Sequence, residues 1–227
     1  MLKRWDCIPD SIKNDQVKLY YDSLYSKRFS LLVKRVFDLI FAIMILIILL
    51  PLCVLIGIAI KLETREPIIY RQIRATQYGK PFKIYKFRRM AVCSDIAENQ
   101  VTVRNDSRIT KVGRILRKYR IDEVPQLINI ILGEMSFVGS RPEVLKYVNE
   151  YTDEMLATLL LPAGITSEAS VQFKDEDVLL EHVKDIDSFY INTILPEKMH
   201  LNLKYLKNYS LVKDMIAIFK TVIGVLK

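Results

Sequence analysis

The stretch FAIMILIILLPLCVLIGIAI, residues 41–60, decides the fold of this chain. All twenty residues are uncharged, and nearly all are large and apolar. As an α-helix, a stretch of this length covers about 30 Å, which is the thickness of the hydrocarbon core of a bilayer. The stretch therefore predicts a helix that enters a membrane.

Two features bear on whether this helix crosses the bilayer. Pro51, in the middle, removes one backbone hydrogen bond and predicts a kink. Basic residues lie on both flanks: Lys27, Arg28, Lys34 and Arg35 before the stretch, and Lys61, Arg65, Arg71 and Arg74 after it. Lys and Arg favour the cytoplasmic side, so a straight span would place one basic cluster outside, whereas a broken helix that returns keeps both inside. From these residues alone, a span and a re-entrant helix both remain open.

The overall composition agrees with a membrane-associated protein but does not identify its function. The chain has 227 residues, 34 of them basic and 26 acidic, and 51% are hydrophobic. A basic excess suits nucleic acid, anionic lipid or phosphorylated substrates, and the high apolar fraction favours the membrane. The widely spaced Cys7, Cys53 and Cys93 indicate a reducing compartment without a zinc site, and His182 and His200 have no motif around them that would suggest metal binding.

Shorter elements are expected downstream, in this chain order: a strand in 66–71, a turn at 78–81, a strand or lipid-lying amphipathic helix over 82–90, helices over 111–119 and 124–132, a helix from about Ser140, loop and strand over 161–173, and a helix over 179–194. Residues 212–226 have apolar side chains at helical spacing, with Lys213 and Lys220 off that stripe. They predict an amphipathic helix that packs on the domain core or docks on an anionic bilayer.

Asp122 and Glu123 form the sharpest candidate pair for chemistry. They precede the 124–132 helix, where free N–H groups suit a phosphate, and several arginines are near in sequence. The residues alone nevertheless favour Asp122 as a simple helix cap, since Asp is a common cap. Ser140 and Glu143 match a capping box, which predicts a helix start there. Arg141 opposes the helix dipole at such a start, and an anionic ligand would explain it.

A longer pattern is specific. In order, these blocks match one family: KRVFDLI (34–40), PFKIYKFRRM (81–90), RNDSRITKVGRILRKYRIDEVPQLINIILGEMSFVGSRPE (104–143), GIT (164–166) and NYSLVKDMIAIFKTV (208–222). From about Lys34 to Lys227 the chain resembles the bacterial sugar transferase family, the monotopic phosphoglycosyl transferases. The resemblance implies a re-entrant membrane helix with Pro51 at its centre. Larger relatives carry further spans ahead of this region, and the chain is expected to be a small form.

The resemblance also implies the chemistry. The aspartate of the family's Asp-Glu dyad, here Asp122, attacks the sugar-bearing phosphate of a UDP-sugar, UMP leaves, and polyprenyl (undecaprenyl) phosphate then takes the phosphosugar. A carboxylate is already ionised at pH 7, so it needs no base, and Mg²⁺ and arginines would reduce the repulsion between anions. Asp122 and Glu123 are the expected Mg²⁺ ligands, and Arg117 matches an arginine that the family keeps five residues before the Asp.

The family's Pro-Arg-Pro element, which contacts uridine, corresponds to Ser140, Arg141 and Pro142, with Ser in place of the first Pro. A further phosphate-contact arginine of the family aligns with Lys174, which keeps the charge but loses the bidentate geometry. The 162–174 loop therefore predicts a subgroup with a different sugar preference.

The expected fold is α+β and mainly helical, with a re-entrant membrane helix hairpin and a small cytoplasmic catalytic domain that carries amphipathic interfacial helices. The expected division is an N-terminal extension at 1–33, the re-entrant helix at 34–62 and the catalytic domain at 63–227. The expected location of the protein is the cytoplasmic face of the bacterial inner membrane. There the enzyme would begin assembly of a glycan for capsule, exopolysaccharide or lipopolysaccharide. The resemblance leaves room for a homodimer and for contacts with downstream glycosyltransferases.

Two rival functions remain at this point. A phosphotransferase with a soluble acceptor would use the same carboxylates, and a non-catalytic scaffold of a glycan assembly complex would be expected to lose Asp122 or Glu123, which are both present. No nucleic-acid recognition motif accompanies the basic charge, so no nucleic-acid partner is expected.

Overall fold

The computed structural model describes residues 2–91, 108–173, 176–180, 183 and 185–226. Its helices and strands are, in chain order, α1 (Asp15–Ser26), α2 (Arg28–Thr64), β1 (Ile69–Ala75), β2 (Pro81–Phe87), α3 (Lys111–Lys118), α4 (Gln126–Leu132), β3 (Met135–Val138), α5 (Leu145–Val148), β4 (Ala163–Thr166), α6 (Glu168–Gln172), α7 (Glu176–Leu179), α8 (Ile186–Phe189), α9 (Leu195–Lys207) and α10 (Leu211–Leu226). The fold is therefore mainly helical with two small sheets, as the sequence predicts.

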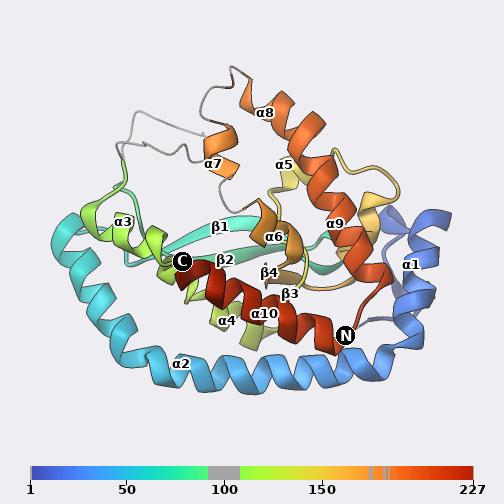
Figure 1. Cartoon of the computed structure of the whole chain (residues 1–227), viewed down its shortest axis with the longest axis horizontal. Helices are drawn as coiled ribbons and strands as arrows, with labels where there is room; N and C mark the ends of the chain where they lie inside the picture. The colour runs from blue at the N-terminus through green and yellow to red at the C-terminus, as the bar shows by residue number, and fades with distance from the viewer. Residues whose placement is uncertain (1, 92–107, 174–175, 181–182, 184, 227) are drawn as a thin grey trace.

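The long apolar helix α2 forms one edge of the molecule (Figure 1). It is a continuous helix of 37 residues with Pro51 inside it, and it bends toward α3 in its second half. Proline removes one helical hydrogen bond and clashes with the preceding turn, which accounts for a bend. The helix is longer at both ends than the 34–62 segment expected from the sequence, and it is long and apolar enough to cross a membrane. The proposed division into three regions stays a prediction.

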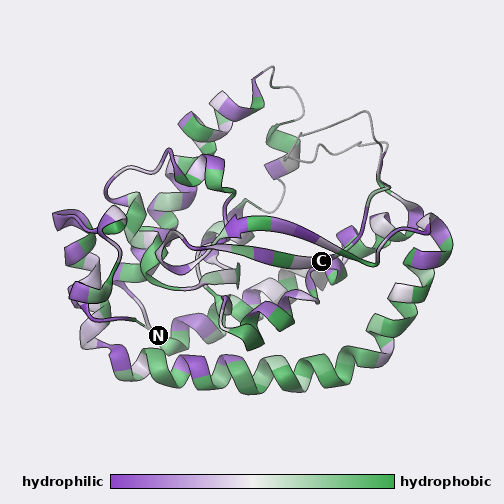
Figure 2. Cartoon of the chain, turned by 180° about the vertical axis from the view of Figure 1, so that it is seen from behind, coloured by the Kyte–Doolittle hydropathy of each residue, from purple (hydrophilic) through white to green (hydrophobic). Residues whose placement is uncertain are grey.

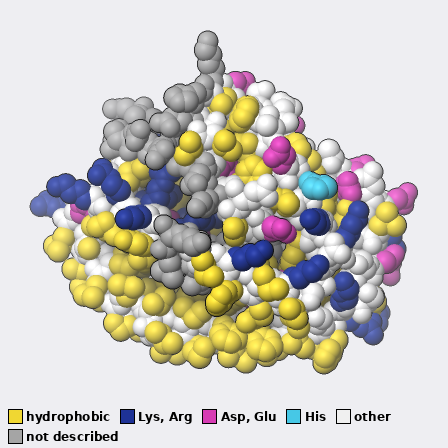
Figure 3. Space-filling model, in the orientation of Figure 1, with side chains coloured by type: hydrophobic (Ala, Val, Ile, Leu, Met, Phe, Trp, Pro, Cys, Tyr) yellow, Lys and Arg dark blue, Asp and Glu magenta, His cyan; other side chains and the backbone are white. Residues whose placement is uncertain are grey.

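The surface of α2 is inverted relative to that of a helix in a water-soluble protein. Large apolar side chains such as Ile47, Ile48 and Leu55 are exposed, while Lys34 and Asp38 are buried against the domain. Figure 2 shows the apolar colour along most of the helix, and Figure 3 shows apolar side chains covering the same edge. An exposed apolar surface of this extent marks contact with a membrane or a partner. Membrane association is therefore indicated.

Both ends of α2 are attached to the same domain by helix capping. Near the start, Arg35 donates to the carbonyls of Ile130 at 2.6 Å and Ile131 at 3.2 Å, in the last turn of α4. Near the end, Glu63 accepts from the backbone N–H groups of Lys111 at 2.7 Å and Val112 at 3.1 Å, the first residues of α3. A cation at a helix C-terminus and an anion at an N-terminus each complement the helix dipole.

Each of the two sheets in the described part of the chain has two strands. Strands β1 and β2 form an antiparallel hairpin, in which Ile69 lies opposite Phe87 and Ala75 opposite Pro81. Its turn includes Tyr78 in a left-handed conformation, with φ 62°. Strands β3 and β4 pair in parallel. The 82–90 segment is thus a strand over most of its length, and the predicted hairpin turn at 78–81 is confirmed.

The core consists of several apolar clusters that pack the helices and the two sheets against one another. One cluster lies between α1 and α9 and includes Leu24, Leu160 and Leu206. A second lies between α2, β2 and α4 and includes Ala42, Ile84 and Ile130. The others include Ile60, Phe87 and Leu116 at the end of α2, and Tyr190, Ile194 and Met199 around the start of α9. Helix α1 thus packs on the same domain as the rest of the chain.

One helix start and one helix cap expected from capping patterns are wrong. No helix begins at Ser140: residues 140–144 have no regular secondary structure, and the next helix, α5, begins at Leu145. The residue before a proline is disfavoured in helical conformation, and Arg141 precedes Pro142. Glu143, the other half of the expected capping box, accepts instead from the hydroxyl of Tyr190 at 2.8 Å.

Asp122 is not the cap of α4. The helix begins at Gln126, its N-cap position is Pro125, and no side chain caps it there. The helix expected over 179–194 begins later, at Ile186, where α8 continues through a π-helical segment at Tyr190–Ile194 into α9. The helices over 111–119 and at the C-terminus are confirmed.

The buried ion pair between Lys34 and Asp214 should be essential for stability. Lys34 Nζ lies 2.7 Å from Asp214 Oδ2, and Tyr205 donates to the other oxygen at 2.8 Å. Burial raises the pKa of Asp214 in spite of Lys34, and removing Asp214 takes away the carboxylate that the buried Lys34 contacts. We expect Asp214→Ala to lower the free energy of unfolding by about 3 kcal/mol, measured by denaturation in detergent.

Matched variants separate this effect from a general loss of charge. The double variant Lys34→Met/Asp214→Ala should recover a large part of the loss, since both charges are gone. In the exposed pair of Lys18 and Asp22, Asp22→Ala should cost less than about 1 kcal/mol. A double variant less stable than Asp214→Ala alone would contradict the assignment.

Candidate active site

The two dyad carboxylates lie on a short 3₁₀ turn, Ile121–Glu123, between α3 and α4. Arg120 precedes the turn in a left-handed conformation, with φ 51°. A side chain other than glycine is strained in that conformation by about 1–2 kcal/mol, and such strain is concentrated at functional sites. The residue ends α3 and redirects the chain, so that Asp122 faces the domain and is only 3% exposed.

Glu123 is the centre of a partly buried charge cluster. Its Oε1 lies 2.8 Å from Arg141 NH2 and 3.2 Å from Lys86 Nζ. Burial alone would raise the pKa of Glu123, but Arg141 and Lys86 outweigh burial and hold its pKa well below the ordinary value. Glu123 in turn raises the pKa of Arg141. Glu123 is therefore ionised, and it fixes two cations that come from distant parts of the chain.

The pKa of Lys86 is lower in this cluster than that of an ordinary lysine. Burial lowers its pKa to about 8, although Glu123 acts in the opposite direction. The charge of Arg141 lowers the pKa of Lys86 further. If an anion binds next to this lysine, its affinity should decrease above about pH 8, where the lysine loses its proton and its charge.

Asp122 faces a different cation. Its Oδ2 lies 3.3 Å from Arg89 Nε, just beyond the end of β2. Burial raises the pKa of Asp122, and the adjacent charge of Glu123 adds to the increase, while Arg89 opposes it. A carboxylate that is poorly hydrated and next to one cation is a stronger nucleophile than a carboxylate in water. The two neighbouring carboxylates thus have different environments, which suits different roles.

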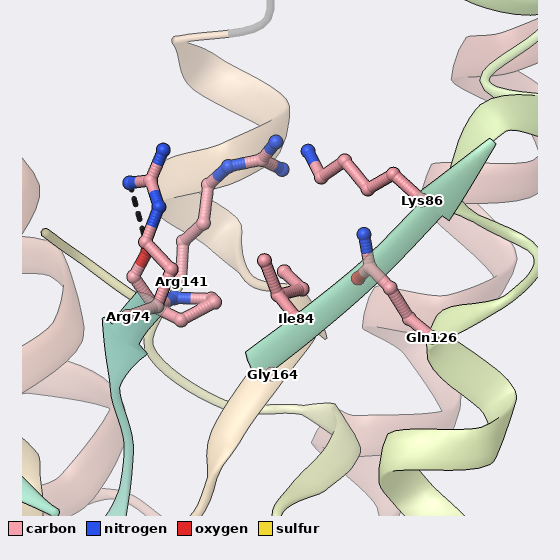
Figure 4. A pocket seen from close by; sticks show the side chains of 7 residues that line it. Arg74, Ile84, Lys86, Gln126, Arg141 and Gly164 are labelled. Atoms are coloured by element: carbon pink, nitrogen blue, oxygen red, sulfur yellow. Dashed lines mark hydrogen bonds between the residues drawn. The ribbon is translucent and has the colours of Figure 1, made fainter. Parts of the chain in front are cut away.

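A small pocket opens beside the dyad and is lined by Arg74, Ile84, Lys86, Gln126, Arg141, Pro142 and Gly164 (Figure 4). Figure 4 shows the guanidinium of Arg141 and the ammonium of Lys86 pointing toward one another, with the amide of Gln126 in the same space. Arg74 donates to the side-chain oxygen of Gln72 at 3.1 and 2.9 Å and to the carbonyl of Pro142 at 3.3 Å. These partners are neutral, so positive charge exceeds negative charge in the lining, and the pocket is suited to an anion.

Close backbone contact forms one side of this pocket. A side chain at Gly164 would place its Cβ 2.2 Å from the backbone nitrogen of Gly139, and a side chain at Gly139 would meet the carbonyl oxygen of Pro162 at 2.7 Å. Only glycine allows the segment after β3 to approach β4 this closely. The N–H of Gly164 also donates to the carbonyl of Ser140 at 2.8 Å, which fixes the segment that carries Arg141.

The structure brings together part of the residue set expected from the sequence. Asp122, Glu123 and Arg141 form one cluster, Pro142 lines the pocket, and Ser140 adjoins it through its backbone. Arg117 is half-buried on α3 and is not among the described residues that line the pocket. Lys174 lies outside the described residues, so its expected role stays a prediction.

Four polar residues of the site were missed by sequence reasoning: Arg74, Lys86, Arg89 and Gln126. A signal for two of them was present. Ile84 and Lys86 are two residues apart and share one face of β2, and Arg74 lies opposite Phe82 on the same face of the hairpin. Reading residues 82–90 firmly as a strand would have placed these cations together.

Binding of a diphosphate in this pocket should weaken above pH 8. Lys86 is charged below its pKa of about 8 and neutral above it, so a bound anion loses one attractive charge as the pH rises. The affinity for UDP, measured by calorimetry at fixed Mg²⁺, should be flat from pH 7 to 8 and then fall by up to about tenfold per pH unit. The terminal phosphate of UDP titrates near pH 6 and does not interfere.

Lys86→Arg stays charged and should remove this fall. Lys86→Met should bind UDP weakly at every pH and should also show no fall. If Lys86→Met keeps the same decline above pH 8, another group causes it and the role of Lys86 is wrong.

Comparison with known proteins places this geometry in a family. A model of the family described as bacterial sugar transferase matches residues 29–227. A UDP-glucose:undecaprenyl-phosphate glucose-1-phosphate transferase of Klebsiella pneumoniae is 33% identical over 193 residues, which cover 83% of this chain and 39% of the relative. A UDP-N-acetylgalactosamine-undecaprenyl-phosphate N-acetylgalactosaminephosphotransferase of Aeromonas hydrophila is 32% identical over 193 residues, which cover 84% of this chain and 43% of the relative.

A further UDP-glucose:undecaprenyl-phosphate glucose-1-phosphate transferase, from Caulobacter vibrioides, is 33% identical over 192 residues, which cover 83% of this chain and 68% of the relative. The chain thus spans about two-fifths of the length of the first two relatives and about two-thirds of the third. The family match includes the dyad, the pocket and the apolar helix, and the chain belongs to the bacterial sugar transferase family.

Proposed function

We propose that this protein is a phosphoglycosyl transferase that moves a sugar 1-phosphate from a UDP-sugar to undecaprenyl phosphate and releases UMP. The observation that carries the proposal is the dyad beside the cationic pocket. A dehydrated carboxylate, Asp122, adjoins a site with a surplus of positive charge, held by Glu123. The relatives named above are transferases that use undecaprenyl phosphate, and two different sugars occur in their names.

The reaction proceeds in two displacements at one phosphorus atom. A carboxylate oxygen of Asp122 attacks the sugar-bearing phosphorus, and the bond from that phosphorus to the bridging oxygen breaks. UMP leaves with the electron pair, and the sugar phosphate remains as an acyl phosphate on Asp122. An oxygen of the lipid phosphate then attacks the same phosphorus, and the Asp122 oxygen leaves with its electron pair, which restores the carboxylate.

The cations of the site offset the repulsion between anions in both steps. Lys86 and Arg141 would face the diphosphate from the pocket, and Arg89 would stay beside the phosphoryl group after it joins Asp122. Fixed charges in a buried site stabilise charge that develops in the transition state without reorganisation. Glu123 would hold Lys86 and Arg141 in place during both steps.

The donor atoms of the dyad fit Mg²⁺ shared with a substrate. The second oxygen of each carboxylate, Asp122 Oδ1 and Glu123 Oε2, makes no hydrogen bond or ion pair with a described residue. The described residues hold no group of three acidic, His or Cys side chains that could form a complete metal site. Mg²⁺ is commonly held by one or two carboxylates together with substrate phosphates. When bound, it would supply Lewis-acid stabilisation of the phosphoryl oxygens.

The attachment of α2 supports a re-entrant topology, and the basic residues on both flanks of the apolar stretch support a catalytic domain on the cytoplasmic face of the inner membrane. Arg35 and Glu63 attach the two ends of the helix to the same domain, although a straight helix of this length would extend about 55 Å. A domain on one side of the bilayer then keeps both ends on that side. Exposed apolar side chains on α10, among them Met215 and Phe219, would contact the same membrane interface.

Cysteine labelling tests this topology. After replacement of Cys7, Cys53 and Cys93 by Ser, single cysteines at the exposed positions Arg28 and Lys61 should both be protected from an impermeant thiol reagent added outside cells. Both should react after the membrane is permeabilised, which serves as the control. Labelling of one position in intact cells would restore a simple span.

Asp122→Asn tests the catalytic role. Because Asp122 does not cap α4, the variant should fold normally, and without Mg²⁺ it should bind UDP at least as tightly as the wild type, since one negative charge is removed. Turnover of a UDP-sugar with undecaprenyl phosphate should fall by at least about 10³-fold, as expected for loss of a nucleophile. UMP release is the measurement.

Glu134→Gln is a matched control, because Glu134 follows the other end of α4 and its partner Asn129 can donate to an amide oxygen as well. This variant should keep near-normal turnover. Near-normal turnover by Asp122→Asn would end the proposal that Asp122 is the nucleophile.

A further inference from the structure

Gln126 has a side-chain amide that faces the pocket and makes no hydrogen bond with a described residue. Its residue is 2% exposed, and no described residue makes a hydrogen bond with its side chain. The side chain lines the pocket, and Figure 4 shows its amide pointing into the space that Lys86 and Arg141 also face. No fully buried side-chain nitrogen or oxygen among the described residues lacks a partner, so the amide of Gln126 is open to the pocket, where a ligand can take the place of water.

The position of Gln126 relates it directly to Asp122. The two residues are four apart, and the backbone between them is helical through Val124 and Pro125. Residues at this spacing lie on the same side, one turn apart. A ligand atom that meets Asp122 would therefore also come within reach of the amide of Gln126.

The chemistry of the pocket restricts what this ligand group can be. The other polar side chains that line it, Arg74, Lys86 and Arg141, are cations, so the ligand group among them is an anion. An amide N–H can donate to an anionic oxygen, and it adds no further repulsion between cations. This matters here because the charge of Arg141 already lowers the pKa of Lys86.

We propose that the side-chain N–H of Gln126 donates a hydrogen bond to a phosphate oxygen of the bound nucleoside diphosphate and so positions the diphosphate beside Asp122. This inference rests on the proposed function for the identity of the nucleotide. The phosphate contact itself depends only on the pocket. Gln126 is thus a substrate-contact residue rather than a core amide.

Asn129 offers an internal control in the same helix. Its amide is fully buried but bonded, accepting from the N–H of Tyr85 at 3.1 Å and donating to the carbonyl of Lys83 at 2.9 Å. Asn129→Ala should therefore lower the Tm markedly, whereas Gln126→Ala loses no hydrogen bond within the protein and should leave the Tm nearly unchanged. This contrast distinguishes a ligand-binding amide from a structural one.

The test is calorimetric binding of UDP to the full chain in detergent with Mg²⁺. Gln126→Ala should weaken UDP binding by about tenfold, as expected for loss of one hydrogen bond to a charged group. Gln126→Glu has the same shape but places a carboxylate next to the phosphate, so it should bind UDP more weakly than Gln126→Ala. Uridine, which has no phosphate, should bind all three proteins equally.

Three outcomes would overturn the inference: UDP affinity unchanged in both variants, Gln126→Glu binding UDP as the wild type does, or uridine affinity reduced as much as UDP affinity. The second outcome would indicate that the amide accepts from a hydroxyl group instead. The release of UMP from a UDP-sugar reports on the proposed function separately. Normal release with unchanged UDP affinity in the Gln126 variants would remove only this inference.

Discussion

The ion cluster of Glu123 with Lys86 and Arg141 is the interaction on which the site depends. It joins the hairpin, the turn that carries the dyad and the segment after β3, which are far apart in sequence. Charges removed from water are stable only when they are paired with good geometry, so each member fixes the positions of the others. The cluster leaves Asp122 next to a different cation, Arg89, and leaves the pocket with a surplus of positive charge. The separate environments of the two carboxylates follow from this one arrangement.

The same rule governs the attachment of the apolar helix. Three polar residues near its ends attach it to the domain: Lys34 is buried and paired, and Arg35 and Glu63 cap helices of the domain. Its large apolar side chains are left on the outside. A helix organised in this way places the pocket at a fixed height above the surface that the helix occupies. An enzyme that joins a water-soluble nucleotide sugar to a lipid phosphate requires such an arrangement, because the two substrates approach from different solvents.

Sequence reasoning predicted the elements that depend on local pattern. The apolar helix, the helix over 111–119 and the amphipathic C-terminal helix have strong periodicity, and the family blocks identified the dyad before its geometry was known. Capping patterns misled, because Asp122 and Ser140 have residue types that suit helix starts but take part in tertiary contacts instead. Arg74 and Lys86 were missed because residues 82–90 were not read firmly as a strand, whereas Arg89 and Gln126 come to the site through packing of the hairpin against the dyad turn and α4, which no local pattern encodes.

The central claim is that the phosphosugar is carried on Asp122, and trapping of that adduct tests it most directly. Purified protein would be incubated with a UDP-sugar and Mg²⁺ without lipid phosphate, then cleaved at acidic pH and analysed by mass spectrometry. The account predicts that the peptide containing Asp122 gains the mass of one sugar phosphate, and that adding undecaprenyl phosphate before cleavage removes it. An unmodified Asp122 peptide from enzyme that is active under the same conditions once lipid phosphate is added, or an adduct on another residue, would contradict the account.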